Sequence, residues 1–177
     1  MRKTITVVLA VVAAGAVLAL GLAVAAFGSS TSTAAPASTS ETTTAPASTS
    51  EQPVVTKYSS KLGRSAEVPK PGGVSSAASG TFSLTLTHAG GKYTAKWKLT
   101  FSGLTGKAVA AHIHQGGPGK AGPVVLALCG PCKSGQSGKA RLSGAAANAL
   151  NGRKAYVNVH TAKNPAGEIR GQVAKTK

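Results

Sequence analysis

The chain has 177 residues and a formal net charge of +16 at pH 7, from 20 Lys and Arg against 4 Asp and Glu. It contains no Asp, which excludes a Ser-His-Asp triad and a pair of aspartate acid/base catalysts. So basic a chain favours polyanionic partners, such as an anionic cell-surface polymer or anionic lipid, although the same lysines could simply keep the surface soluble. Aromatic residues are too few for a base-stacking platform, so nucleic acid is not the expected partner.

Residues 1–27 are predicted to be a signal peptide or an N-terminal membrane anchor. Arg2 and Lys3 precede an apolar run from Ile5 to Phe27. A helix of about 23 residues, at ~1.5 Å each, is long enough to cross a bilayer core of about 30 Å. Ala23-Val24-Ala25 also has the small side chains of a cleavage site, so both fates stay open. In either case the rest of the chain is expected outside the cytoplasm, membrane-tethered or secreted.

Residues 28–56 are predicted to form a disordered linker. They are rich in Ser, Thr, Ala and Pro, and the sequence Ala-Pro-Ala-Ser-Thr-Ser-Glu occurs at 35–41 and again at 45–51. Such a segment has too little apolar surface to offset the entropy that is lost when a chain becomes ordered. It would act as a spacer, and its composition is also that of O-glycosylated stalks.

Residues 57–177 are predicted to form one all-β domain, an antiparallel, Greek-key-like β-sandwich of about seven or eight strands. The clearest pattern is the alternation of apolar and polar residues before and after the turn His88-Ala89-Gly90-Gly91. A helical turn is expected only at 145–150. Strands are expected at 81–87, 93–101, 108–114, 123–128, 138–142, 154–160 and 168–173.

Three histidines are predicted to lie on the same side of their strands. Alternation assigns His112, His114 and His160 to the side opposite the apolar residues, which are Val109, Ala111, Ile113, Ala155, Val157 and Val159. Imidazole is the commonest metal ligand, and a His-x-His pair can hold one ion together with a third His from a neighbouring strand. The alternative is structural, with these imidazoles hydrogen-bonded to backbone or to Asn158.

The two cysteines form the motif Cys129-Gly130-Pro131-Cys132, which matches the thioredoxin dithiol motif. That chemistry needs the first cysteine at a helix N-terminus, where its pKa is lowered. Here the motif follows an apolar strand and precedes the loop Lys133–Gly138, without a helix. In an exported protein we therefore expect a structural Cys129–Cys132 disulfide, with thiol–disulfide exchange as the alternative.

Several short motifs follow one another along residues 57–177. They are Lys61–Pro69, Ser79-Gly80-Thr81, Phe101–Thr105, Ala111–His114, Gly122–Val125, Tyr156–Thr161 and Asn164–Gln172. In kind and order they resemble the CHRD domain, a module named after chordin and found in many exported bacterial proteins. The resemblance implies a β-sandwich, and it does not imply any particular enzyme activity. The expected function is thus a non-enzymatic surface binding or structural module with a basic face.

Two stretches of the domain are also similar to copper/zinc superoxide dismutase. Gly103-Leu104-Thr105 followed by His112-Ile113-His114 looks like the stretch that ends in that family's His-x-His copper ligands, and Val157–His160 with Gly167–Gly171 looks like its last copper histidine and its anion-steering arginine. This similarity implies copper binding by the three histidines and Arg170 facing the open position. Glu168 shares the parity of Arg170, so it is expected on the same face, where it could orient an imidazole. The bridging histidine is missing, and without Asp that family's zinc site cannot be built. Copper binding with redox activity is therefore the alternative function.

Overall fold

The structure is a computed structural model and describes residues 52–176. The predicted signal peptide or anchor (1–27) lies outside the described residues, as does most of the predicted linker (28–56). Among residues 52–176 no helix has both the length and the apolar character needed to span a bilayer.

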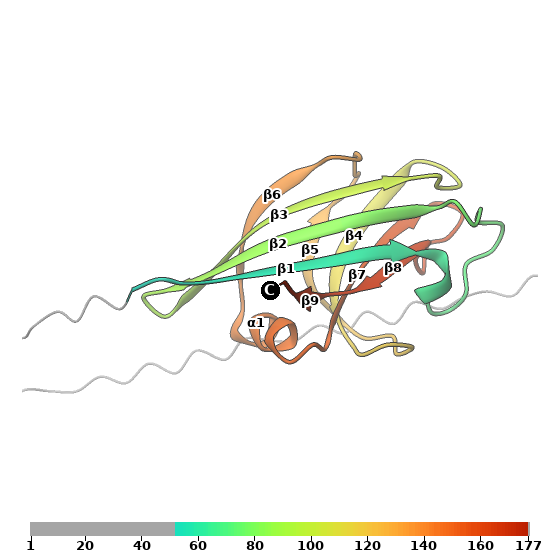
Figure 1. Cartoon of the computed structure of the whole chain (residues 1–177). Coiled ribbons are helices and arrows are strands. Elements are labelled where there is room, and N and C mark those ends of the chain that lie inside the picture. The colour runs from blue at the N-terminus through green and yellow to red at the C-terminus, as the bar shows by residue number, and fades with distance from the viewer. Residues whose placement is uncertain (1–51, 177) are drawn as a thin grey trace, which may run out of the picture. The chain divides into compact units, whose positions relative to one another are not determined.

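The described residues form nine β-strands, one short 3-10 helix and one α-helix (Figure 1). This agrees with the predicted all-β class. The strands are β1 (Val54–Gly63), β2 (Ser79–Ala89), β3 (Lys92–Ser102), β4 (Ala108–Gln115), β5 (Val124–Cys129), β6 (Ser137–Leu142), β7 (Ala155–Thr161), β8 (Ile169–Gln172) and β9 (Ala174–Lys175). The helices are η1 (Arg64–Ala66), which follows β1, and α1 (Gly144–Asn151), which confirms the predicted helical turn.

The strands form one antiparallel sheet that folds over on itself as a sandwich. Their order is β5-β4-β7-β8-β1-β2-β3-β6, and β9 pairs with β1. Strands β1, β2, β3 and β6 lie side by side in one layer (Figure 1), and the other layer contains β8, β7, β4 and β5. Between β1 and β8 the only Cα pairing is Gly63 with Arg170, so the two layers diverge from this junction. The chain crosses between layers from β3 to β4, from β5 to β6 and from β6 to β7, in keeping with the predicted Greek-key-like sandwich.

The alternation predicted for β2 and β3 is confirmed. Phe82 faces Leu99, and Leu84 faces Trp97, and all four side chains are buried in the core. Gly90 and Gly91 join the two strands with φ of +53° and +68°, a conformation that suits a two-residue hairpin and that glycine adopts without strain. The turn chemistry and the apolar alternation therefore specify the same register.

Two details of the sheet differ from the prediction. Strand β1 begins at Val54, inside the predicted linker, and no strand was expected there because the polar Ser60 occupies one of its buried positions. In β4 the register shifts between Ala108 and Ala110, so Val109 is 44% exposed and Ala108 is buried instead. A β-bulge of this kind reverses the side to which residues point, which simple alternation does not foresee.

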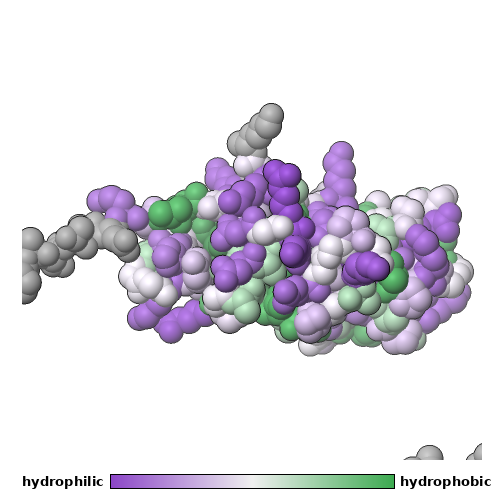
Figure 2. Space-filling view, turned by 90° about the horizontal axis from the view of Figure 1, so that it is seen from below, coloured by the Kyte–Doolittle hydropathy of each residue, from purple (hydrophilic) through white to green (hydrophobic). Residues whose placement is uncertain are grey.

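Hydrophilic side chains cover much of the face drawn in Figure 2, with smaller groups of hydrophobic residues between them. Every buried apolar side chain of the described residues lies between Tyr58 and Val173. Contacts divide the chain into two units, of which Ala47–Lys177 is one. Because this unit contains its own hydrophobic core, it is expected to fold by itself and is suited to solution experiments.

The close approach of β8 to β1 predicts a strong effect of Gly171→Ala. An added Cβ would overlap the carbonyl oxygen of Lys61 and the hydroxyl of Ser60. We expect the free energy of unfolding to fall by about 2 kcal/mol, within the usual range for overpacking. Urea denaturation of residues 47–177 measures it. Gly144→Ala is the matched control, since its Cβ meets no atom within 4 Å; equal stability of the two variants would contradict this packing.

Candidate metal centre

The structure brings the three predicted histidines together. Strands β4 and β7 are neighbours, with Ala110 opposite His160 and His112 opposite Asn158. His112, His114 and His160 can each offer one ring nitrogen, and these nitrogens all lie within 4.8 Å of one another. His160 is only 8% exposed, and the other two are partly buried. The cluster lies on the side of β4 and β7 opposite the apolar core, as the alternation predicts.

Backbone carbonyls orient two of the imidazoles. Nδ1 of His114 donates to the carbonyl oxygen of Gly122 at 2.8 Å, and Nδ1 of His160 donates to that of Pro165 at 3.0 Å. In both rings Nε2 is then the nitrogen with a free lone pair. Metal-binding imidazoles are usually held in this way, because a hydrogen bond at one nitrogen sets the tautomer that leaves the other free.

The remaining nitrogens face one another. Because Nδ1 of His160 donates to Pro165, its Nε2 is an acceptor, and Nδ1 of His112 donates a hydrogen bond to it at 3.1 Å. Nε2 of His114 is buried and has no hydrogen-bond partner among the described residues. Two nitrogens bound to the same ion at about 2.0–2.1 Å lie about 3 Å apart. The spacing of His112 and His160 therefore suits a shared ion, and a nitrogen of His114 lies within 4.8 Å of theirs.

Burial keeps two of these imidazoles neutral. It lowers the pKa of His112 below the usual value, and the neighbouring His160 and His114 lower it further. Burial also lowers the pKa of His160, as does His114, although the hydrogen bond to Pro165 acts in the opposite direction. A neutral imidazole has the lone pair that a metal ion requires, so the direction of these pKa shifts favours metal binding.

Loops cover the histidine side of the sheet, and Arg170 holds one of them. This side chain is 1% exposed. Its Nη2 donates to the carbonyl oxygens of Gly117 and Lys120, at 2.9 Å each, and its guanidinium lies over the ring of Tyr156 at 3.4 Å. The ring of His114 also stacks on the ring of Tyr156, with the two ring centroids 4.9 Å apart. Arg170 thus fastens the loop between β4 and β5, whereas the resemblance to superoxide dismutase implies that it faces an open coordination position.

The contacts of Glu168 also differ from the predicted one to an imidazole. Its carboxylate is fully buried and accepts hydrogen bonds from the backbone and hydroxyl of Thr105, the hydroxyl of Thr161 and the amide of Asn164. Burial raises its pKa, but these hydrogen bonds outweigh that effect and hold the pKa below its usual value. Glu168 therefore joins the β3–β4 loop to β7 and to the loop after it. The carbonyls of Gly122 and Pro165 take the orienting role at the imidazoles.

A second carboxylate, Glu67, is buried near the histidines. It is 1% exposed, and an added Cβ at Gly167 would overlap both its Oε2 and the amide of Asn158. Asn158 pairs with His112 on one side and with Arg170 on the other. Glu67 Oε2, Asn158 Oδ1 and Arg170 Nη1 are buried without hydrogen-bond partners among the described residues. Buried polar atoms without partners are uncommon, so this side of the sheet has the composition of a binding site rather than of a core.

Some residues around the three histidines were not predicted from the sequence. Tyr156 has the same parity as His160, so alternation alone could have placed it beside the cluster. Glu67 carried only a weak signal, as one of two carboxylates in the domain. No sequence pattern could have predicted the role of the carbonyl oxygens of Gly122 and Pro165, because every residue type has a backbone carbonyl.

The predicted disulfide is present. Cys129 and Cys132 are bonded, with Cα atoms 5.2 Å apart. The backbone N–H of Cys132 donates to Ala108, so the bridge ties the end of β5 to the start of β4. The α-helix α1 begins only after β6, so Cys129 lacks the helix N-terminus that a catalytic dithiol requires.

The residues fit the copper ion that the similarity to superoxide dismutase implies. The donor set is three imidazoles, two of them with lowered pKa values, and one buried nitrogen has no other partner. Nitrogen ligands suit copper and zinc, and copper binds more tightly in the Irving–Williams order. Bound copper would supply one-electron redox chemistry, while the chain itself orients two of the imidazoles through the carbonyls of Gly122 and Pro165.

Comparison with protein families gives one match. The CHRD domain family model matches residues 58–173, which span β1 to β8 together with the histidine cluster and the disulfide. No curated protein and no solved structure matches the chain. Since the match covers most of the chain, the protein belongs to the CHRD domain family.

Proposed function

We propose that this CHRD domain binds one divalent transition-metal ion, copper in preference to zinc, through His112, His114 and His160. The observation that carries the proposal is the convergence of three imidazole nitrogens within 4.8 Å on a covered side of the sheet. Structural and metal-binding roles are compatible here. One nitrogen of His114 and one of His160 hold loops, and Nε2 of His114 has no partner among the described residues. The hydrogen bond between His112 and His160 would be exchanged for two bonds to the ion once the His112 proton moves from Nδ1 to Nε2.

Competition with a chelator tests this proposal. Residues 47–177 are titrated with Cu(II) in the presence of a chromophoric chelator of known affinity, and then with Zn(II). We expect one equivalent of Cu(II) to be withdrawn from the chelator, and Zn(II) to bind at the same site more weakly. Binding of several weak equivalents, or none that competes with the chelator, would reject the site.

We also infer that the protein is exported and either tethered to the membrane or secreted. Arg2, Lys3 and the apolar run to Phe27 support this inference, as does a disulfide that would persist in an oxidising compartment. Detection of the chain outside the cytoplasm, with its N-terminal mass, would distinguish a cleaved from an uncleaved segment. Recovery of the intact chain from the cytoplasm alone would reject export.

A second candidate function is polyanion binding at the outer face of the β1–β2–β3–β6 layer. Seven exposed cationic side chains have the outward parity of this face, and no carboxylate interrupts them. Lys57, Thr85, Lys96 and Lys139 form one row across the four strands. The basic face, as we call it, consists of Lys57, Lys61, Lys92, Lys96, Lys98, Lys139 and Arg141, with serine and threonine between them. An anionic cell-surface polymer is the partner that this charge pattern suits.

If the basic face binds an anionic polymer, this binding should depend on salt, and replacing two of its lysines should weaken it. Because polyanion binding releases counterions, retention of residues 47–177 on an anionic polymer should fall steeply as salt rises. The double variant Lys96→Gln/Lys139→Gln should elute at lower salt than the wild type. Lys163→Gln is the matched control, since this lysine is exposed outside the basic face. Identical elution of all three proteins would show that the face does not bind the polymer.

A further inference from the structure

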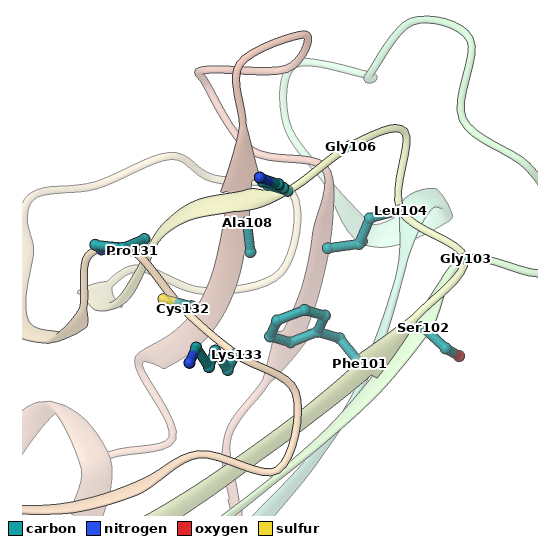
Figure 3. A pocket seen from close by; sticks show the side chains of 10 residues that line it. Phe101, Ser102, Gly103, Leu104, Gly106, Ala108, Pro131, Cys132 and Lys133 are labelled. Atoms are coloured by element: carbon teal, nitrogen blue, oxygen red, sulfur yellow. The ribbon is translucent and has the colours of Figure 1, made fainter.

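A cavity of about 560 Å³ lies at the end of the sandwich where β3 passes into β4 (Figure 3). It is separate from the histidine cluster, and none of the three imidazoles lines it. The side chains of Phe101, Leu104, Ala108 and Cys132 border it and give it a mainly apolar wall. Its volume is within the range of small-molecule sites in proteins, which is about 300–1,000 Å³.

The walls of this cavity are held in place by bonds that do not depend on a ligand. The Cys129–Cys132 disulfide closes one side, and the backbone N–H of Cys132 donates to Ala108 at 3.0 Å. On another side the hydroxyl of Ser134 accepts from the N–H of Phe101 at 2.8 Å and donates to its carbonyl at 2.6 Å. A preformed site loses less conformational entropy on binding, so these bonds favour ligand affinity.

The charge at the cavity is positive. Lys107 and Lys133 both line it and both are exposed, whereas no carboxylate lines it. The two carboxylates of residues 52–176 are Glu67 and Glu168, and both are buried elsewhere. An apolar wall with two lysines beside it matches a ligand that has an apolar body and a single anionic end.

We propose that this cavity binds an anionic amphiphile, namely a medium-chain fatty carboxylate. The hydrocarbon chain contacts Phe101, Leu104 and the disulfide, and the carboxylate lies near Lys107 and Lys133 in water. This site differs from the basic face, which offers charge without an apolar cavity. It is also independent of metal binding, because no histidine takes part.

A chain-length series tests the apolar part of the proposal. Residues 47–177 are titrated with hexanoate, octanoate and decanoate below micelle-forming concentrations, and chemical shifts are followed by NMR. Affinity should rise about fourfold with each buried methylene group until the cavity is full. Shift changes should gather at Phe101–Ala108 and Pro131–Lys133. Changes centred on the basic face, or an affinity independent of chain length, would overturn the proposal.

The charge part is tested with a neutral ligand and with variants. Decanol should bind about three- to tenfold more weakly than decanoate, and Lys107→Gln/Lys133→Gln should remove this difference, as expected for exposed ion pairs. Lys163→Gln should leave it unchanged. Leu104→Trp would fill the cavity and abolish binding of both ligands, while an unchanged Cu(II) titration would show that the domain is still folded. Equal binding of decanol and decanoate by the wild type would contradict the assignment of an anionic ligand.

Discussion

Cu(II) affinity is expected to fall by about a hundredfold or more when His160 is replaced by alanine. Loss of a residue that only orients a ligand already costs about 10–100-fold in metal affinity, and His160 would supply a donor atom itself. His160 is also the imidazole with the least exposure, and its Nε2 lies 3.1 Å from His112. The competition titration with residues 47–177 measures the change, and His112→Ala should reduce the affinity similarly.

The fourth histidine provides the matched control. His88 lies at the end of β2 and stacks on Tyr93, with ring centroids 4.3 Å apart. His88→Ala should leave the tight equivalent of Cu(II) in place, since this imidazole is not part of the cluster. If His88→Ala and His160→Ala weakened binding equally, copper would be held at dispersed surface sites and the cluster would not be its ligand set.

Glu168→Gln is expected to lower the free energy of unfolding at pH 7 by about 4 kcal/mol. The carboxylate accepts hydrogen bonds from Thr105, Thr161 and Asn164, and these groups act as donors toward it. The amide N–H group of glutamine would face donors and leave at least one of them without an acceptor. Urea denaturation of residues 47–177 gives the difference.

The pH dependence of this effect has a defined sign. The folded-state pKa of Glu168 lies below its usual value. Its stabilising contribution is therefore complete above the unfolded-state pKa of about 4.3 and is lost as pH falls through the lower, folded-state pKa. The difference between wild type and Glu168→Gln should shrink in that acidic window. A difference that stayed constant down to pH 2 would show that the charge of Glu168 does not contribute.

Glu67→Gln offers a contrast with the opposite sign. Burial raises the folded-state pKa of Glu67, although Val68, Arg170 and Asn158 partly oppose this. Stability from a raised pKa is present below the unfolded-state value and is lost as pH rises through the folded-state pKa. At pH 7, Glu67→Gln should therefore lower the free energy of unfolding by less than Glu168→Gln does.

The fold could largely be predicted because its strands obey simple rules. In β2 and β3 the apolar residues alternate without a break, and two glycines form the turn between them. Strand β1 was missed because Ser60 interrupts that alternation at a buried position. Strand β1 is stabilised by its pairing with β2 and β8, which come later in the sequence.

The three histidines of the candidate site could be placed together from the sequence, but their surroundings could not. Parity placed His112, His114 and His160 on one side, and the pairing of β4 with β7 brings them together. The predicted role of Arg170 came from resemblance and that of Glu168 from shared parity, and both side chains instead hold loops. Which loop reaches a buried charge depends on tertiary packing, and strand periodicity contains no information about it.

Electron paramagnetic resonance of residues 47–177 with one equivalent of Cu(II) tests the metal centre most directly. Hyperfine coupling reports the nitrogens bound to the ion. The three-histidine site predicts coupling to three imidazole nitrogens, reduced to two in His114→Ala and unchanged in His88→Ala. A spectrum without imidazole coupling, or one that stays the same when His112, His114 and His160 are all replaced, would contradict a metal centre at this cluster.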